Sequence, residues 1–147
     1  MTLQIRKART GDFAGWSTLY AGYAAFYEVE QTEAMRERVW GWVNDPAHEV
    51  EGFVAEQDGQ LVGLAHFRAF ARPLSASEGG FLDDLFVSPE ARGSGTAAAL
   101  IAAIKAEGQS RGWTVIRWIT AENNARARGL YDQIATATAW VTYDLKL

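Results

Sequence analysis

The sequence predicts an α+β fold in which a mixed β-sheet is flanked by helices. Two kinds of segment predict it: short ones in which apolar residues alternate, and longer ones with apolar residues at helical spacing. A third observation is that the two kinds are interleaved, in the expected order β α α β β β α β α β. Since a chain of 147 residues suits one domain, we expect residues 1–147 to form a single domain.

The first half of the chain is expected to hold two helices between strands. Residues 3–8 alternate as a strand does, and Asp12 can cap a helix that continues to residue 28. Thr32 can cap a second helix, which extends to residue 45. The pair Asp58-Gly59 is a hairpin turn signal within residues 51–71.

The second half is expected to alternate strands with helices. Residues 75–80 are predicted as a loop. The segments that follow are expected to be a strand over 81–87, a helix over 96–110, a strand over 114–120, a short helix over 124–134 and a final strand over 138–147. Arg111 and Gly112 suit the C-terminus of the longer helix.

The composition excludes several classes of chemistry. With no cysteine, the chain has no disulfide, no cysteine-based metal site and no thiol nucleophile. We expect no metal site, because neither His48 nor His66 lies in a ligand or triad pattern. The N-terminus lacks a signal-peptide core, and no apolar run approaches the ~18 residues of a membrane span, so a cytoplasmic protein without membrane contact is expected. A net charge of −4 argues against nucleic-acid binding and suits cationic small substrates.

A glycine-rich corner joins the predicted strand 81–87 to the helix that follows. It contains Arg92, Gly93, Ser94, Gly95, Thr96 and Ala97. A helix N-terminus presents unpaired N–H groups, glycines allow close approach of an anion, and arginine adds a charged contact, which together suit a pyrophosphate. The Walker pattern requires a lysine that is absent, and the dinucleotide fingerprint requires a third spaced glycine. Taken alone, the corner also fits a tight turn that binds nothing.

The chain resembles the GNAT N-acetyltransferase superfamily. The corner fits that superfamily's Arg/Gln-x-x-Gly-x-Gly/Ala signature, and the segment from Asn124 to Tyr131 fits its Asn-x-x-Ala-x-x-x-Tyr pattern. The strand "LFV" and the order of elements are also similar. The resemblance implies a three-layer fold around a mixed, mostly antiparallel sheet. "FLDDLFV" is similar to the diamine and polyamine branch and to the fungal Hpa-type enzymes, with Asp83 in place of the usual Glu. The usual Gly-Phe after Tyr131 is replaced by an atypical segment over 134–140.

The resemblance implies acetyl-CoA as co-substrate and direct attack by an amine. It implies that the backbone of Leu85, Phe86 and Val87 pairs with the pantetheine arm, that the corner holds the pyrophosphate, and that Asn124 contacts the cofactor. Tyr131 would be the general acid. Asp83 would be the base or would position a water, and Asp84 would contact the substrate. In a regular strand these two aspartates point to opposite faces, unless a bulge re-aims the strand. Each assignment has an alternative. Asp83 and Asp84 also fit a solvated acid pair, and Leu85, Phe86 and Val87 also fit ordinary core strand residues. Tyr131 also fits a buried aromatic, and Asn124 also fits a helix cap.

The acceptor is expected to be a small primary amine, such as a diamine, a polyamine or an amino-acid-like compound. Tyr23, Phe26, Tyr27, Glu28 and Glu30 can surround a cation through charge and cation–π contact, although they also fit an amphipathic helix with a solvated acidic end. Protein or peptide amines, an aminoglycoside and a non-catalytic acyl-CoA-binding module are the alternatives. Relatives in this branch imply a homodimer.

Overall fold

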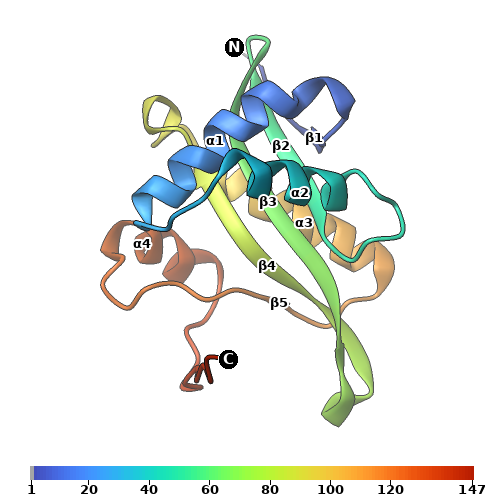
Figure 1. Cartoon of the computed structure of the whole chain (residues 1–147). Helices are drawn as coiled ribbons and strands as arrows, with labels where there is room; N and C mark the ends of the chain where they lie inside the picture. Colours follow the sequence, from blue (N-terminus) through green and yellow to red (C-terminus); the bar gives the residue numbers. More distant parts are fainter. Residues whose placement is uncertain (1) are drawn as a thin grey trace.

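The computed structural model describes residues 2–147 and places a five-stranded sheet between two layers of helices (Figure 1). The strands are β1 (Leu3–Lys7), β2 (Glu51–Gln57), β3 (Gln60–Arg72), β4 (Ser77–Val87) and β5 (Ile116–Arg117). The helices are α1 (Phe13–Phe26), α2 (Glu33–Val43), α3 (Thr96–Arg111) and α4 (Ala125–Ile134). Strands follow one another across the sheet in chain order, antiparallel except for the parallel pair β4–β5. The predicted α+β class and mostly antiparallel sheet are confirmed.

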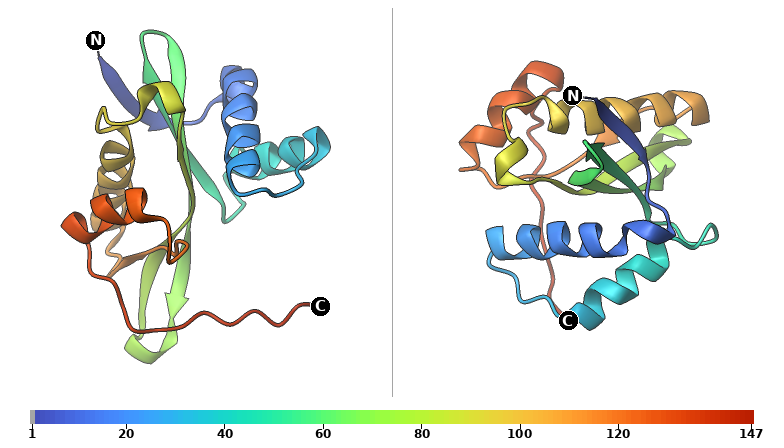
Figure 2. Two further views of the ribbon diagram at one scale, coloured as in Figure 1. Left: turned by 90° about the vertical axis from the view of Figure 1, so that its left-hand side faces the viewer. Right: turned by 90° about the horizontal axis from the view of Figure 1, so that it is seen from above.

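Each face of the sheet has its own apolar core. Figure 2 shows α1 and α2 on one face and α3 and α4 on the other. Trp16 of α1 packs with Val54 and Leu64 on the first face, whereas Leu100 and Ile104 of α3 pack with the cluster of the second face. Fully burying such a side chain contributes roughly 1.5–3 kcal/mol, so the two clusters hold the helices on the sheet.

Local signals fixed several boundaries as predicted. The Thr32 hydroxyl accepts from the Met35 N–H over 3.1 Å and caps α2. Gly112 ends α3 with a φ of 77°, in the left-handed region that glycine tolerates best. Asp58 and Gly59 both have positive φ, at 53° and 79°, which is the backbone of a two-residue type I′ hairpin turn.

The predicted loop over 75–80 is wrong from Ser77 onward. β4 begins at Ser77, and the turn is confined to residues 73–76, with Ala76 at a φ of 51°. Gly79 and Gly80 are typical of loops in the sequence, but in the structure they are strand residues against which Val115 and Trp113 pack closely. A Cβ on Gly80 would lie 2.5 Å from Cε3 of Trp113, and one on Gly79 would lie 2.9 Å from Cγ1 of Val115. Because these two glycines have no Cβ, the segment after α3 can pack closely against β4.

The predicted final strand over 138–147 is also wrong for the single chain. Residues 135–147 have no regular secondary structure, and the strand expected over 114–120 is reduced to Ile116–Arg117. A strand is held by hydrogen bonds to a neighbour. In this chain 138–147 has no neighbouring strand, and β5 meets β4 at only two positions.

Candidate active site

The edge of β4 is open where the sequence predicts cofactor binding. β4 pairs with β3 along its length, but it pairs with β5 only at Gly80 and Phe81. Beyond that point the edge from Leu82 to Val87 has no strand beside it among the described residues. The side chains of Leu85, Phe86 and Val87 pack into the two cores. Their side chains are therefore committed to packing, while one backbone edge is available to an extended ligand.

A β-bulge places both aspartates on the same side of the sheet. Asp84 is opposite His66 and Leu82 is opposite Phe67, so Asp83 is the extra residue without a partner. Leu82 and Leu85 both contact the α3-side core. Between them the aspartates contact neighbouring side chains of β3 on the other face. Asp84 bonds to His66, and Asp83 pairs with Arg68, two residues further along β3. The regular-strand expectation of opposite faces is wrong, because the bulge breaks the alternation.

Asp84 is a partly buried carboxylate that Tyr20 and His66 hold in place. Its Oδ2 accepts from the Tyr20 hydroxyl over 2.8 Å and lies 2.8 Å from Nδ1 of His66. Burial acts to raise the pKa of Asp84, but the bonds from His66 and Tyr20 outweigh it and hold the pKa below its usual value. Asp84 is therefore ionised at neutral pH.

The tautomer of His66 follows from its second neighbour. The indole Nε1 of Trp16 lies 2.9 Å from His66 Nε2, and an indole nitrogen can only donate. Nε2 therefore accepts, and the proton of the neutral ring sits on Nδ1, which donates to Asp84. In this tautomer neither His66 nor the Tyr20 hydroxyl carries a positive charge, so no cation offsets the ionised Asp84 carboxylate.

Asp83 has a different environment. Its Oδ2 lies 3.0 Å from Nε of Arg68, in a half-exposed ion pair. Partial burial raises the pKa of Asp83, although the arginine opposes this. The adjacent aspartates thus differ: Asp83 is paired with a cation, and Asp84 is not.

The glycine-rich corner has the geometry of a helix N-terminus open to an anion. Gly93 and Gly95 have φ values of 83° and 84°, and nothing lies within 4 Å of where their Cβ atoms would be. The first N–H of α3 to bond back along the helix is that of Ala99, to the Gly95 carbonyl at 3.0 Å. The N–H groups before it point out of the helix end. Ser94 Oγ lies 2.8 Å from the buried Thr96 hydroxyl and also bonds to the Ala91 carbonyl, which shapes the loop.

The Arg92 side chain does not extend over this corner. Its Nε donates to the Val87 carbonyl over 3.3 Å, and its guanidinium lies 5.6 Å from the ring centres of Phe26 and Phe86. Arg92 thus links the end of β4 to the end of α1. Its charge lies near the aromatic end of α1.

Tyr131 and Asn124 come from α4. The half-buried Tyr131 ring meets Trp118 edge-on at 5.2 Å between centres. Burial raises the pKa of Tyr131, with a smaller contribution from Tyr27, so the phenol stays protonated at neutral pH. Asn124 stands at the N-cap of α4, and its Nδ2 donates to the Thr120 hydroxyl over 3.2 Å.

An aromatic row on α1 leads to Asp84. Tyr20, Tyr23 and Tyr27 follow one another along the helix, with ring centres 6.0 and 5.0 Å apart, and Tyr23 also meets Phe86 edge-on. Tyr27 is 40% exposed, and Glu28 follows it in a left-handed conformation with a φ of 56°. The row therefore runs from an exposed, acidic end of the helix to the partly buried carboxylate of Asp84.

Residues 16–135 match the Acetyltransferase (GNAT) family. The chain belongs to this family. It is an acyltransferase, and the resemblance inferred from the corner and from Asn124–Tyr131 is confirmed.

Two named N-acetyltransferases are similar to this chain over most of their length. The uncharacterized N-acetyltransferase YhfO of Bacillus subtilis is 29% identical over 136 residues, which cover 89% of this chain and 87% of YhfO. The D-amino-acid N-acetyltransferase HPA3 of Saccharomyces cerevisiae is 25% identical, over 95% of this chain and 88% of HPA3. The similarity to HPA3 confirms the relationship to Hpa-type enzymes.

Solved structures share the fold. A ribosomal-protein-alanine N-acetyltransferase from Brucella melitensis biovar Abortus 2308 superimposes with a TM-score of 0.83 at 25% identity, covering 100% of both chains. The aminoglycoside N-acetyltransferase AAC(6')-Iy, solved in complex with CoA, superimposes with a TM-score of 0.86 at 21% identity, over 99% of this chain and 95% of that one. Both support the three-layer architecture of the acetyltransferase.

Three residues of the site were not among the predicted ones: Trp16, Tyr20 and His66. The tyrosine spacing along α1 was a usable signal, since residues three and seven positions after Tyr20 lie on the same helix face. No local signal placed His66 beside Asp84, because their register depends on the bulge.

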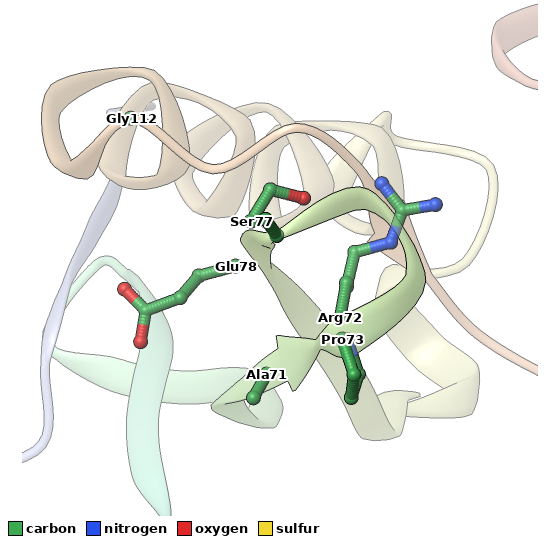
Figure 3. Close-up of a pocket in the computed structure, with 7 residues that line it drawn as sticks. Ala71, Arg72, Pro73, Ser77, Glu78 and Gly112 are labelled. Carbon is green, nitrogen blue, oxygen red and sulfur yellow. The ribbon is translucent and has the colours of Figure 1, made fainter.

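A separate hollow of about 540 Å³ lies at the opposite end of the β3–β4 ladder (Figure 3). Arg72, Ser77 and Glu78 line it. The Arg72 guanidinium and the Ser77 hydroxyl are both bonded to the Thr114 hydroxyl, at 2.7 and 3.0 Å. Two polar side chains of the hollow are thus bonded to Thr114, and the hollow lies away from the open end of β4 where the site is. Among residues 2–147, no three His, Cys, Asp or Glu side chains gather as metal ligands, and no helix is long and apolar enough to cross a membrane.

Proposed function

We propose that this acetyltransferase transfers the acetyl group of acetyl-CoA to the primary amine of a small cationic substrate by direct attack. The observation that carries the proposal is the Asp84 carboxylate, ionised and held by neutral donors at the end of an aromatic row. A carboxylate without a paired cation attracts an ammonium group, and aromatic faces add cation–π attraction.

The co-substrate would lie along the open edge of β4. Family membership supports acetyl-CoA, which supplies the activated acetyl thioester. The open backbone edge at Leu85, Phe86 and Val87 would pair with the amides of the pantetheine arm, although the Val87 carbonyl also accepts from Arg92 Nε. The corner Gly93–Ala97 follows directly, and its outward N–H groups suit the pyrophosphate.

In this proposal Asp84 binds the ammonium group of the substrate and Asp83 accepts its proton. An alkylammonium group has a pKa of about 10 and must lose a proton before it can attack. Asp84 binds the cation, because its charge is not offset by an arginine. Asp83, one residue away on the same side, receives the proton directly or through a water. Its raised pKa makes it the better proton acceptor of the two.

Tyr131 would protonate the departing thiolate of coenzyme A. Its raised pKa keeps the phenol in the acid form at neutral pH. Asn124, two helical turns earlier on α4, would contact the cofactor through its amide. Tyr23, Tyr27 and Glu28 would surround the substrate at the exposed end of α1.

A peptide amine is the second candidate acceptor. It is favoured by the similarity of the whole chain to the ribosomal-protein-alanine enzyme at 25% identity. The exposed Phe26 and Tyr27 at the end of α1 also suit an apolar peptide side chain.

The test is release of CoA thiol in the presence of acetyl-CoA and a panel of acceptors. The panel contains polyamines, lysine analogues, D-amino acids, aminoglycosides and short peptides with an N-terminal alanine. We expect turnover with at least one small amine, and Asp84→Asn should raise its KM at least tenfold. Asp132→Asn on the exposed face of α4 is the matched control and should change neither constant. Turnover with peptides alone would reject the small-amine proposal.

A second variant tests catalysis itself. Tyr131→Phe should lower kcat by about 10²–10⁴-fold, the usual contribution of a general acid, while acetyl-CoA still binds with native affinity. Unchanged turnover would remove Tyr131 from the acid role. Tight acetyl-CoA binding with no turnover on any acceptor by the native protein would instead indicate a non-catalytic module.

A further inference from the structure

His66 is a buried imidazole whose two ring nitrogens are both bonded to protein groups. It is 1% exposed, on β3 between Gly52 of β2 and Asp84 of β4. Its Nδ1 donates to Asp84 Oδ2 over 2.8 Å, and its Nε2 accepts from the indole Nε1 of Trp16 over 2.9 Å. Because neither nitrogen is free to exchange a proton with a substrate, His66 is not placed to act as a general base. Its contacts suit a residue that positions Asp84.

The Asp84 carboxylate keeps one oxygen available to a ligand. The His66 ring and the Tyr20 hydroxyl both bond to the same oxygen, Oδ2. Neither of them bonds to Oδ1. Burial acts to raise the pKa of Asp84, and His66, Tyr20 and Tyr23 together hold it below its usual value. An ammonium group can therefore bond to Oδ1 of an ionised carboxylate while Oδ2 stays held by the protein.

A second proton on His66 would change the charge of this site. With a proton on Nδ1 only, the ring holds Asp84 and carries no charge. With a proton on both nitrogens, it would form an ion pair with Asp84 and cancel the charge that attracts an ammonium group. Trp16 opposes the second proton, because an N–H at Nε2 would face the indole N–H, and two donors cannot bond to each other.

Few titratable or charged groups face the His66 ring from the elements packed against it. They are Tyr20 of α1, Arg68 of β3, and Asp83 and Asp84 of β4. Burial raises the pKa of Tyr20, so its hydroxyl stays neutral. Arg68 is paired with Asp83, and Gly52 of β2 has no side chain. Asp84 is the remaining charge, and it favours a second proton on His66, whereas Trp16 opposes one.

We propose that Trp16 and His66 are positioning residues that make the acceptor site specific for a cationic amine. Trp16 occupies Nε2 of His66, so that the ring holds Asp84 without bringing a positive charge to it. This inference rests on the proposed function, in which Asp84 binds the ammonium group of the substrate. It explains how the carboxylate stays an uncompensated anion although a histidine lies beside it.

The first experiment determines the protonation of His66 without any substrate. The ring-nitrogen shifts of ¹⁵N-labelled histidine report whether Nδ1, Nε2 or both carry a proton. At pH 8, above the ordinary imidazole value of about 6.5, native His66 should carry its proton on Nδ1. His48 is an internal reference with the opposite tautomer, because its Nδ1 accepts from the Val50 N–H over 3.0 Å.

The same spectra at pH 6 separate the native protein from Trp16→Phe. The variant should show both His66 nitrogens protonated, and the native protein should still show Nδ1 alone. Proton uptake at the same pH in both proteins would overturn the inference. A native His66 that is doubly protonated at pH 6 would also overturn it, so the inference stays falsifiable if Trp16→Phe does not fold.

The second experiment measures KM at pH 8 and pH 6 for the small amine of the acceptor panel that has the highest turnover. From pH 8 to pH 6 the ratio of the Trp16→Phe KM to the native KM should rise about tenfold, the effect of one interaction with a charged group, while KM for acetyl-CoA is unchanged. Trp40→Phe is the matched control, because its ring lies 4.8 Å from that of Trp16 in the same cluster and its indole N–H donates to none of residues 2–147. Its ratio should not depend on pH. A pH-independent ratio for Trp16→Phe would mean that Trp16 acts by packing alone, and would overturn the inference.

His66→Asn provides a rescue test. The asparagine amide can still donate to Asp84, but it has no second nitrogen to protonate. In this background, adding Trp16→Phe should leave the KM ratio independent of pH, and a retained pH dependence would contradict the role of His66. If the native protein acetylates no small amine, the proposed function fails, and the histidine spectra still decide separately whether Trp16 controls the charge of His66.

Discussion

Replacing Tyr20 by phenylalanine removes one hydroxyl group and leaves the packing of α1 in place. That hydroxyl donates to Asp84 over 2.8 Å, while the ring lies 5.2 Å from the ring of Trp16 and 4.7 Å from that of His66. A hydrogen bond to a charged group contributes about 1.5–3 kcal/mol to stability. Since one pKa unit corresponds to about 1.4 kcal/mol, the pKa of Asp84 should rise by about 1–2 units in the variant.

The pH dependence of this effect has a definite sign. Burial acts to raise the pKa of Asp84, yet the bonds from His66 and Tyr20 hold it below the value of an unfolded aspartate. The ionised group therefore stabilises the native state above the unfolded pKa of about 3.9, and this contribution is lost as the pH falls through the lower native pKa. Tyr20→Phe should lower the free energy of unfolding by about 1.5–3 kcal/mol at pH 7, and the difference from the native protein should shrink below about pH 4.

The assay is urea unfolding at fixed protein concentration at pH 7 and at pH 3, with the Asp84 carboxyl carbon followed by NMR titration. Tyr27→Phe is the matched control, because Tyr27 is the C-cap residue of the same helix but is 40% exposed. It should change stability by less than about 0.5 kcal/mol. If the two variants unfold alike at pH 7, Tyr20 does not hold Asp84 and the reasoning about this carboxylate is refuted.

Three further variants test the corner, a buried ion pair and a cap. Gly95→Ala should destabilise by about 1–2 kcal/mol and weaken acetyl-CoA binding in calorimetry, because Gly95 has a φ of 84°; Gly41→Ala within α2 should be neutral or stabilising. Asp12→Asn should cost about 3 kcal/mol at pH 7 in urea unfolding and less as the pH falls below about 4, since the hydrogen bond from Arg6 lowers the pKa of Asp12; no pH dependence would contradict this. Thr32→Ala should cost about 1 kcal/mol of unfolding free energy, and a cost near zero would show that the cap is not used.

The sequence alone determined the features that depend on neighbouring residues. A cap such as Thr32 acts within one turn of its helix, and Asp58-Gly59 forms a turn from its own backbone preferences. The positive φ of Gly93 and Gly95 at the start of α3 is likewise a local property. The corner and the Asn124–Tyr131 segment were therefore recognisable, and with them the family.

Features that depend on distant pairing were decided only by the tertiary structure. Gly79 and Gly80 resemble loop residues until Trp113 and Val115 are seen to cross above them.

The two aspartates show the same limit at the site. Their common side follows from a bulge opposite His66, which no pattern within "FLDDLFV" encodes. The different charges around Asp83 and Asp84 come from Arg68 and His66 on the neighbouring strand. The sequence thus supplied two carboxylates in the right place, and the pairing of β3 with β4 made them chemically distinct, because hydrogen-bond partners and burial are set by residues that are distant in the chain.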